Sequence, residues 1–177
     1  MPEGIIITGL NGCGKSTVCK ALAEKLNYFS MDVEDYYFID SDIPYSKFHT
    51  HSQTKELMLD DILKHKNYVL ATVNCDWGEE IISTYKFAVV LTAPLNIRMA
   101  RIKEREFKKF GKRVLSGGDL YESQQKFHNK VSARGKEHID KQMKYIKCPV
   151  LELDATVSID EIVDIICEKY SEVNKNE

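Results

Sequence analysis

The sequence lacks any apolar run long enough to cross a bilayer. Its longer runs, such as Phe87–Leu91, fall far short of the roughly 20 residues that a spanning helix needs. It also lacks a basic leader with a small-residue cleavage site, because the chain passes almost directly from Met1 into the apolar run Gly4–Ile7. We therefore expect neither secretion nor a membrane partner.

Cysteine is scarce, and its spacing excludes two kinds of site. The five cysteines are odd in number and include no Cys-x-x-Cys pair, which argues against a disulfide framework and against a zinc site. A reducing compartment, the cytoplasm, is the expected location. The length of 177 residues predicts a single domain, 1–177, with a core of its own.

Arginine is absent from residues 1–97. Residues 98–147 hold all five arginines and carry 15 Lys and Arg against 6 Asp and Glu, whereas the rest of the chain carries 10 against 21. A basic segment of this kind can bind nucleic acid or the phosphates of a small ligand. The motif described below favours phosphates, so we expect no nucleic-acid partner.

Short apolar strands alternate with helical patterns along the chain. The spacing predicts strands near residues 4–8, 28–31, 68–73, 87–91 and 150–153, and helices near 15–26, 53–65, 79–85, 94–107, 120–147 with a break at Gly135, and 159–170. This alternation is typical of βαβ units. We predict an α/β fold, a three-layer α/β/α sandwich around a parallel sheet of about five strands.

The segment Gly9-Leu10-Asn11-Gly12-Cys13-Gly14-Lys15-Ser16 matches the phosphate-binding pattern G-x-x-x-x-G-K-[ST] at every fixed position. It follows a predicted strand and opens a predicted helix, as the mechanism requires, because backbone N–H groups and the helix N-terminus together hold phosphate. Lys15 is expected to reach the β- and γ-phosphates and Ser16 to bind Mg²⁺. The nucleotide-binding residues are predicted to be Asn11, Gly12, Cys13, Gly14, Lys15, Ser16 and Thr17. A helix N-terminus lowers a thiol pKa, so oxidation of Cys13 is conceivable unless its side chain enters the core.

With this loop, the chain resembles the small P-loop kinases, which include adenylate, shikimate and gluconate kinases and belong to the P-loop nucleoside triphosphate hydrolase superfamily. The resemblance extends over nearly the whole chain, although only the phosphate loop is highly specific. It implies an enzyme that uses ATP and Mg²⁺ to phosphorylate a hydroxyl of a small molecule. It also implies an acceptor-binding segment at about residues 32–66 and a lid at about 107–119.

Two stretches similar to the family's substrate region suggest site residues. Asp32-x-Glu34 resembles the carboxylate pair that faces the acceptor and the metal, which implies Asp32 as general base and Mg²⁺ ligand and Glu34 as a substrate contact. Either neighbouring carboxylate could instead be the base, or the stretch could be a solvated acidic turn. Asn74 and Asp76 follow the third strand, where the family often has glycines, and are expected at the substrate, although Asp76 could merely cap the next helix.

Two further stretches resemble the nucleotide-facing parts of these kinases. The helix after Pro94 resembles the one leading into the lid, which implies that Arg105 lies near the adenine. Arg113 is the first candidate to contact the transferring phosphoryl group and Arg134 the second, because a guanidinium pairs two phosphate oxygens. A surface salt bridge is the alternative for each arginine. Thr156 belongs to the stretch that resembles the adenine loop.

The arginine-free first half disfavours nucleoside monophosphates and shikimate as acceptors, since the family grips their charges there with arginine. The acidic, aromatic stretch Asp32–Phe38 instead favours an uncharged or cationic acceptor, such as a sugar, nucleoside, polyol or antibiotic-like molecule. Two alternatives stay open, a nucleoside monophosphate or shikimate kinase, and a regulatory ATPase or nucleotide-dependent binding module without such an acceptor. The sequence leaves open which acceptor is used, the lid conformation and the oligomeric state.

Overall fold

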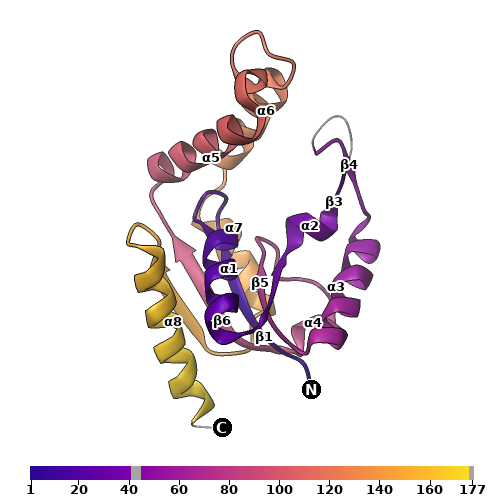
Figure 1. Ribbon diagram of the computed structural model, residues 1–177, viewed down its shortest axis with the longest axis vertical. Coiled ribbons are helices and arrows are strands. Elements are labelled where there is room, and N and C mark those ends of the chain that lie inside the picture. Colours follow the sequence, from indigo (N-terminus) through magenta and orange to yellow (C-terminus); the bar gives the residue numbers. More distant parts are fainter. Residues whose placement is uncertain (41–44, 176–177) are drawn as a thin grey trace.

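The computed structural model describes residues 1–40 and 45–175 (Figure 1). The strands are β1 (Glu3–Gly9), β2 (Phe29–Asp32), β3 (Phe38–Ile39), β4 (Lys47–Phe48), β5 (Asn67–Ala71), β6 (Tyr85–Thr92) and β7 (Val150–Asp154). The helices are α1 (Lys15–Leu26), α2 (Val33–Tyr37), α3 (His51–His65), α4 (Glu79–Ile82), α5 (Leu95–Phe110), α6 (Tyr121–Ser132), α7 (Lys136–Gln142) and α8 (Ile159–Asn174), with 3₁₀ turns η1 (Gly111–Val114) and η2 (Met143–Tyr145). In this part of the chain no helix has both the length and the apolar content to cross a bilayer.

Five parallel strands form the central sheet in the order β2-β5-β1-β6-β7. Successive side chains of a strand point to opposite faces, and β1 shows the consequence. Ile5 and Ile7 pack with residues of α1 and α8 on one face, while Ile6 packs with residues of α3 and α4 on the other. Both faces are therefore covered, and the predicted three-layer α/β/α sandwich is confirmed.

The structure adds elements that periodicity did not predict. Residues 33–48, expected as an acidic stretch and a loop, contain the short helix α2 and the antiparallel pair β3–β4. Strands of two residues are too short to show any alternation, which explains the omission. Part of the expected acceptor-binding segment, residues 41–44, lies outside the described residues.

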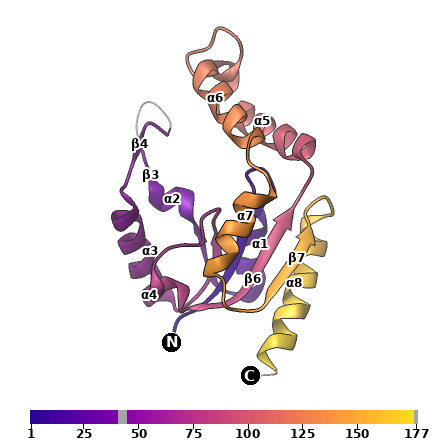
Figure 2. The same cartoon turned by 180° about the vertical axis from the view of Figure 1, so that it is seen from behind.

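Two parts of the molecule project beyond the phosphate-loop end of the sheet. One comprises α5, η1 and α6, and the other comprises α2 with the β3–β4 hairpin; both views show them on opposite sides (Figures 1 and 2). The helix α5 continues to Phe110, three residues past its predicted end, and η1 begins at Gly111. We refer to α5, η1 and α6 together as the lid region, because these elements and their connections include the predicted lid at about residues 107–119.

Candidate active site

The phosphate loop has the backbone geometry that its glycines permit. Gly9, Gly12 and Gly14 all have positive φ angles, of 142°, 85° and 92°. A Cβ on Gly12 would lie 2.5 Å from the carbonyl oxygen of Arg98, so the loop approaches α5 too closely for a side chain. Gly14 precedes α1 without a side-chain cap, which leaves the first N–H groups of that helix available to an anion.

Lys15 lies within this loop, half-buried. Its Nζ donates a hydrogen bond to the carbonyl oxygen of Leu10 over 3.2 Å. Burial lowers the pKa of Lys15, whereas the negative charges of Glu34 and Asp32 act in the opposite direction. All three residues line one cavity, although they lie at or beyond the ends of different strands of the sheet.

A cavity of about 780 Å³ opens above the phosphate loop, and we call it the nucleotide cavity. Its walls include Lys15, Ser16, Asp32 and Glu34, together with five further predicted residues, Asn11, Gly12, Gly14, Thr17 and Arg105. Hydroxyl and carboxylate oxygens are the ligands that Mg²⁺ prefers, so Ser16 and the two carboxylates form a chemically suitable set. The volume lies in the range usual for ligand sites.

The two acidic residues of this cavity have distinct environments. Asp32 is the N-cap of α2, and its Oδ1 accepts a hydrogen bond from the N–H of Glu34 over 3.0 Å. Tyr36 fixes α2 to α3 by donating to Asp61 over 2.8 Å. Burial raises the pKa of Glu34, and the charge of Asp32 raises it further, while Arg105 and Lys15 oppose the change. Glu34 therefore holds a proton more tightly than an ordinary glutamate.

Two arginines hold the phosphate loop from outside. Arg98, which is 5% exposed, donates to the carbonyl oxygen of Asn11 over 3.2 Å. Arg134 donates to the side-chain Oδ1 of the same residue over 2.8 Å, from the connection between α6 and α7. The sequence suggested Arg134 as a phosphoryl contact, and the structure places it beside the loop.

Of the two predicted adenine contacts, Arg105 and Thr156, only Arg105 lines the nucleotide cavity. Arg105 lines it together with Lys15 and Glu34. Arg101, one turn earlier on α5, donates to the carbonyl oxygen of Ala155 over 2.8 Å and lines the cavity together with residues 157–159. Thr156 itself is absent from the cavity lining, and its N–H donates to Asp154 over 2.9 Å. Sequence reasoning missed Arg101, although its spacing of four residues from Arg105 on one helix was a usable signal.

Arg113 lies apart from these residues. Its guanidinium forms a two-pronged ion pair with Asp119 at the end of the lid region, with contacts of 2.7–3.2 Å. It lines neither the nucleotide cavity nor the second cavity described below. In this conformation Arg113 makes the surface salt bridge that the sequence offered as its alternative.

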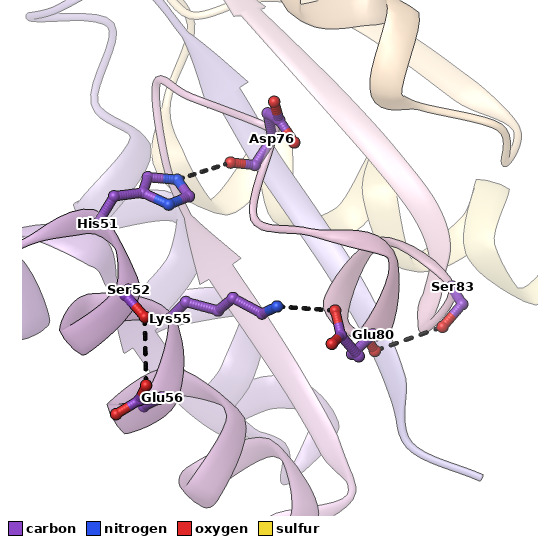
Figure 3. Close-up of polar contacts among 7 residues, drawn as sticks. All are labelled: His51, Ser52, Lys55, Glu56, Asp76, Glu80 and Ser83. Carbon is purple, nitrogen blue, oxygen red and sulfur yellow. Dashed lines mark hydrogen bonds and ion pairs between the residues drawn. The ribbon is translucent and has the colours of Figure 1, made fainter.

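Asn74 and Asp76 also lie outside the nucleotide cavity, whose wall in this region consists of Ala71, Thr72 and Val73. The side chain of Asn74 accepts a hydrogen bond from the N–H of Asp76 over 3.3 Å, so it stabilises its own turn. The carbonyl oxygen of Asp76 bonds to His51 over 3.0 Å, while its carboxylate points away from that ring (Figure 3). Next to this contact, Lys55 of α3 pairs with Glu80 of α4 over 2.8 Å. The contact with His51 joins the turn to α3, and the ion pair joins α3 to α4.

Cys13 differs from the reactive thiol that its position suggested. The residue is 2% exposed and packs in the core cluster beneath α1. Burial raises the pKa of the Cys13 thiol, although the charges of Lys15 and Arg98 act in the opposite direction. The structure therefore matches the alternative that the sequence left open for Cys13, in which its side chain enters the core, and desolvation outweighs the nearby positive charges.

A second cavity of about 260 Å³ lies between the lid region and the β3–β4 hairpin, and we call it the aromatic cavity. Glu34, Arg105 and Lys109 line both cavities and so form their shared boundary. The remaining wall residues are Phe38, Tyr45, Glu106, Phe110, Ser123, Gln124 and Phe127. The sequence predicted substrate contacts at about residues 32–66 and at Asn74 and Asp76, and it indicated none from α6, whose packing against the hairpin has no local signal.

Comparison with known proteins identifies the family. A protein-family model described as "AAA domain" matches residues 5–125, about two thirds of the chain. A Bacillus subtilis (strain 168) protein described as "Uncharacterized protein YqaC" is 29% identical over 179 residues, covering 97% of this chain and 99% of that protein.

Solved structures share the fold at low sequence identity. A gluconokinase from Sinorhizobium meliloti 1021 superposes with a TM-score of 0.56 at 13% identity, covering 99% of this chain and 95% of its own. A shikimate kinase from Acinetobacter baumannii, in complex with shikimate, gives 0.59 at 15% identity, covering 97% and 94%. Together with the phosphate loop and the sheet order, these matches show that the chain belongs to the AAA domain family and has the fold of the small P-loop kinases.

Proposed function

We propose that this protein is a kinase that transfers the γ-phosphoryl group of Mg·ATP to a hydroxyl group of a small molecule. One observation carries the proposal. The cavity that contains Lys15, Ser16, Asp32 and Glu34 shares its boundary with a second cavity. A regulatory ATPase needs only the nucleotide cavity, whereas a kinase needs an adjoining place for its acceptor.

The proposed reaction forms one bond and breaks one. The acceptor oxygen bonds to the γ-phosphorus, the bond from that phosphorus to the β–γ bridging oxygen breaks, and ADP leaves. The hydroxyl proton passes to a carboxylate at the boundary of the two cavities. Lys15 and the loop N–H groups compensate the phosphate charge, and Mg²⁺ near Ser16 and Asp32 would neutralise the charge that develops on the bridging oxygen.

Asp32 and Glu34 are the two candidates for the general base. Asp32 lines only the nucleotide cavity, while Glu34 lines both and has the raised pKa. We propose that Glu34 accepts the acceptor proton and that Asp32 serves Mg²⁺. If so, Glu34→Gln removes the acid limb of the pH–rate profile and leaves Mg²⁺ affinity unchanged. Asp32→Asn instead raises the Mg²⁺ concentration needed for half-maximal rate. If instead Asp32→Asn removes the acid limb and Glu34→Gln raises the Mg²⁺ requirement, Asp32 is the general base.

Among the arginines, we propose that Arg105 contacts the transferring phosphoryl group in the conformation described here, because it already lines the boundary of the cavities. Arg113 could take that role only after the lid region moved and its pair with Asp119 opened. Arg105→Ala should therefore lower kcat more than Arg113→Ala does. Equal losses of kcat in the two variants would favour a movement of the lid region that brings both arginines to the phosphoryl group.

A nucleoside monophosphate kinase is the second candidate, and one observation favours it. Residues 1–97 contain no arginine, but the fold brings Arg105 and Lys109 to the wall of the aromatic cavity from α5. Two cations there could hold an acceptor phosphate.

We also propose that the protein is located in the cytoplasm, because its five cysteines are all free thiols, as is usual in a reducing compartment.

An ADP-release screen with Mg·ATP tests the proposed function. It compares sugars, polyols, nucleosides, nucleoside monophosphates, shikimate and aminoglycosides. Acceptor-dependent ADP formation supports a kinase, and the preferred acceptor separates the two candidates. Slow ADP formation that no acceptor accelerates would contradict both and favour a regulatory ATPase.

A further inference from the structure

The aromatic cavity is lined by both charged side chains and aromatic rings. Glu34, Arg105 and Lys109 line its boundary with the nucleotide cavity. Four rings also line it, those of Phe38, Tyr45, Phe110 and Phe127. An acceptor that fills this space can therefore contact the rings and also present a polar, reactive group toward the nucleotide cavity.

The rings favour a flat ligand. Phe38 and Tyr45 meet edge to face with centroids 4.7 Å apart, and Tyr45 meets Phe110 in the same way at 6.1 Å. Lys109 donates to the hydroxyl of Tyr45 over 3.1 Å, so the lid region and the hairpin already touch on this side of the cavity. A flat π-system can stack on such rings, whereas a polyol gains no such contact from them.

Gln124 supplies the second, independent observation. It lines the aromatic cavity, its residue is 8% exposed, and no hydrogen bond to its side-chain amide is found within residues 1–40 and 45–175. The amide is open to solvent within the cavity and is not sealed in the core, so a ligand in the cavity can bond to it. An amide offers one acceptor and two donors in a plane, which matches the edge of a nitrogen heterocycle.

The neighbouring polar groups do not share this feature. Glu106 and His128 are 6% and 8% exposed, and they bond to each other over 2.7 Å between α5 and α6. Ser123, also in the wall, donates to the carbonyl oxygen of Leu120 over 2.8 Å. Gln124 is therefore distinguished from the polar groups around it by the missing partner.

We propose that the aromatic cavity binds the phosphoryl acceptor through a flat nitrogen heterocycle, with the ring edge bonded to Gln124 and the reactive oxygen directed toward Glu34. The inference rests on the proposed kinase function and narrows its acceptor to a molecule with a nucleobase-like ring. Nucleosides and nucleoside monophosphates both carry such a ring. With a monophosphate, a phosphate oxygen takes the place of the hydroxyl as nucleophile, and Arg105 and Lys109 compensate its charge.

The kinetic test compares ring-bearing and ring-free acceptors. ADP release with Mg·ATP is measured for adenosine, guanosine, cytidine and thymidine, for their 5′-monophosphates, and for D-ribose, D-gluconate and shikimate. We expect turnover with a ring-bearing acceptor, and the nucleoside and monophosphate arms identify the source of the ring. Gln124→Leu should then raise KM for that acceptor about tenfold, the effect expected for one lost neutral hydrogen bond, with KM for ATP unchanged.

Gln125→Leu is the matched control, because Gln125 is the next residue of α6, is exposed and is absent from the cavity wall. It should leave both KM values unchanged. Gln124→Glu keeps the shape of the side chain but replaces the amide donors, so it should shift the preference among the four bases. This variant also tests the role of Gln124 if the leucine variant fails to fold. Equal KM values for wild type, Gln124→Leu and Gln124→Glu would overturn the role of Gln124.

Failure of this inference is distinguishable from failure of the proposed function. Turnover with the ring-free acceptors alone would overturn the heterocycle and leave the kinase intact. If no acceptor is turned over, equilibrium dialysis of the same nucleosides and monophosphates, with a non-hydrolysable ATP analogue present, tests the cavity directly. Binding that Gln124→Leu weakens and Gln125→Leu does not supports the heterocycle site, and absence of binding overturns it.

Discussion

Arg134 donates a hydrogen bond to the side-chain oxygen of Asn11 over 2.8 Å, and so joins the end of the lid region to the phosphate loop. The two residues are 123 positions apart in sequence. Arg98 holds the backbone carbonyl of the same asparagine. The conformation of the loop and the position of α6 are therefore coupled through one residue.

Removing this bond should weaken nucleotide binding without abolishing it. We expect Arg134→Ala and Asn11→Ala each to weaken ATP binding several-fold in calorimetry. The double variant should show a coupling free energy of about 1 kcal/mol, the usual net contribution of a hydrogen bond. Strictly additive effects would mean that the contact does not operate in solution.

Lys15→Ala should abolish catalysis. The ammonium group is expected to compensate charge on the γ-phosphate, and loss of one such preorganised group lowers kcat by about 10²–10³-fold or more. Steady-state ADP release measures the loss, and calorimetry should show weaker ATP binding. Lys20→Ala is a suitable control, since Lys20 is exposed on the same helix and lines neither cavity. An unimpaired Lys15→Ala enzyme is incompatible with the assignment.

Glu34→Gln should stabilise the ligand-free protein near neutral pH. The pKa of Glu34 is raised in the folded state by burial and by Asp32, so the folded state binds this proton more tightly than the unfolded state does. Stability contributed by Glu34 is therefore present at low pH, where the group is protonated in both states, and falls as pH rises from the unfolded pKa to the folded pKa. Above that window the glutamine variant, which has no charge to desolvate, should melt at the higher temperature.

Thermal unfolding at several pH values checks this prediction. The advantage of Glu34→Gln should disappear at pH values below the ordinary glutamate pKa. Because the carboxylate is proposed as the base, the same variant should lose activity while it gains stability. A melting-temperature difference that does not change with pH would assign the effect to packing instead.

Gly12→Ala should disrupt the phosphate loop by steric contact with α5. The added Cβ would lie 2.5 Å from the carbonyl oxygen of Arg98, at a φ of 85°. Gly117→Ala provides a matched control, because Gly117 has a φ of 86° but no atom within 4 Å of the added Cβ. Both variants incur the left-handed strain of about 1–2 kcal/mol, and only Gly12→Ala adds the clash. Urea unfolding and ATP calorimetry should show the larger losses in Gly12→Ala, and equal losses would contradict the close approach.

The sequence by itself determined the phosphate loop and the layered fold. The loop is a local motif whose glycines and lysine act within eight residues, and the strands of a parallel sheet appear as short apolar runs because both of their faces are buried. Asp32 and Glu34 were predicted from the resemblance to the small P-loop kinases, and the structure places them at the end of β2 and in the first turn of α2.

Only the tertiary structure decided which distant side chains share a wall. It paired Arg113 with Asp119, brought Arg134 to Asn11, and set Gln124 beside rings from the β3–β4 hairpin region. It also brought arginine to the aromatic cavity from outside the arginine-free half of the chain. The reason is physical: these contacts depend on how α5 and α6 pack over the loop and the hairpin, and local periodicity contains no information about that packing.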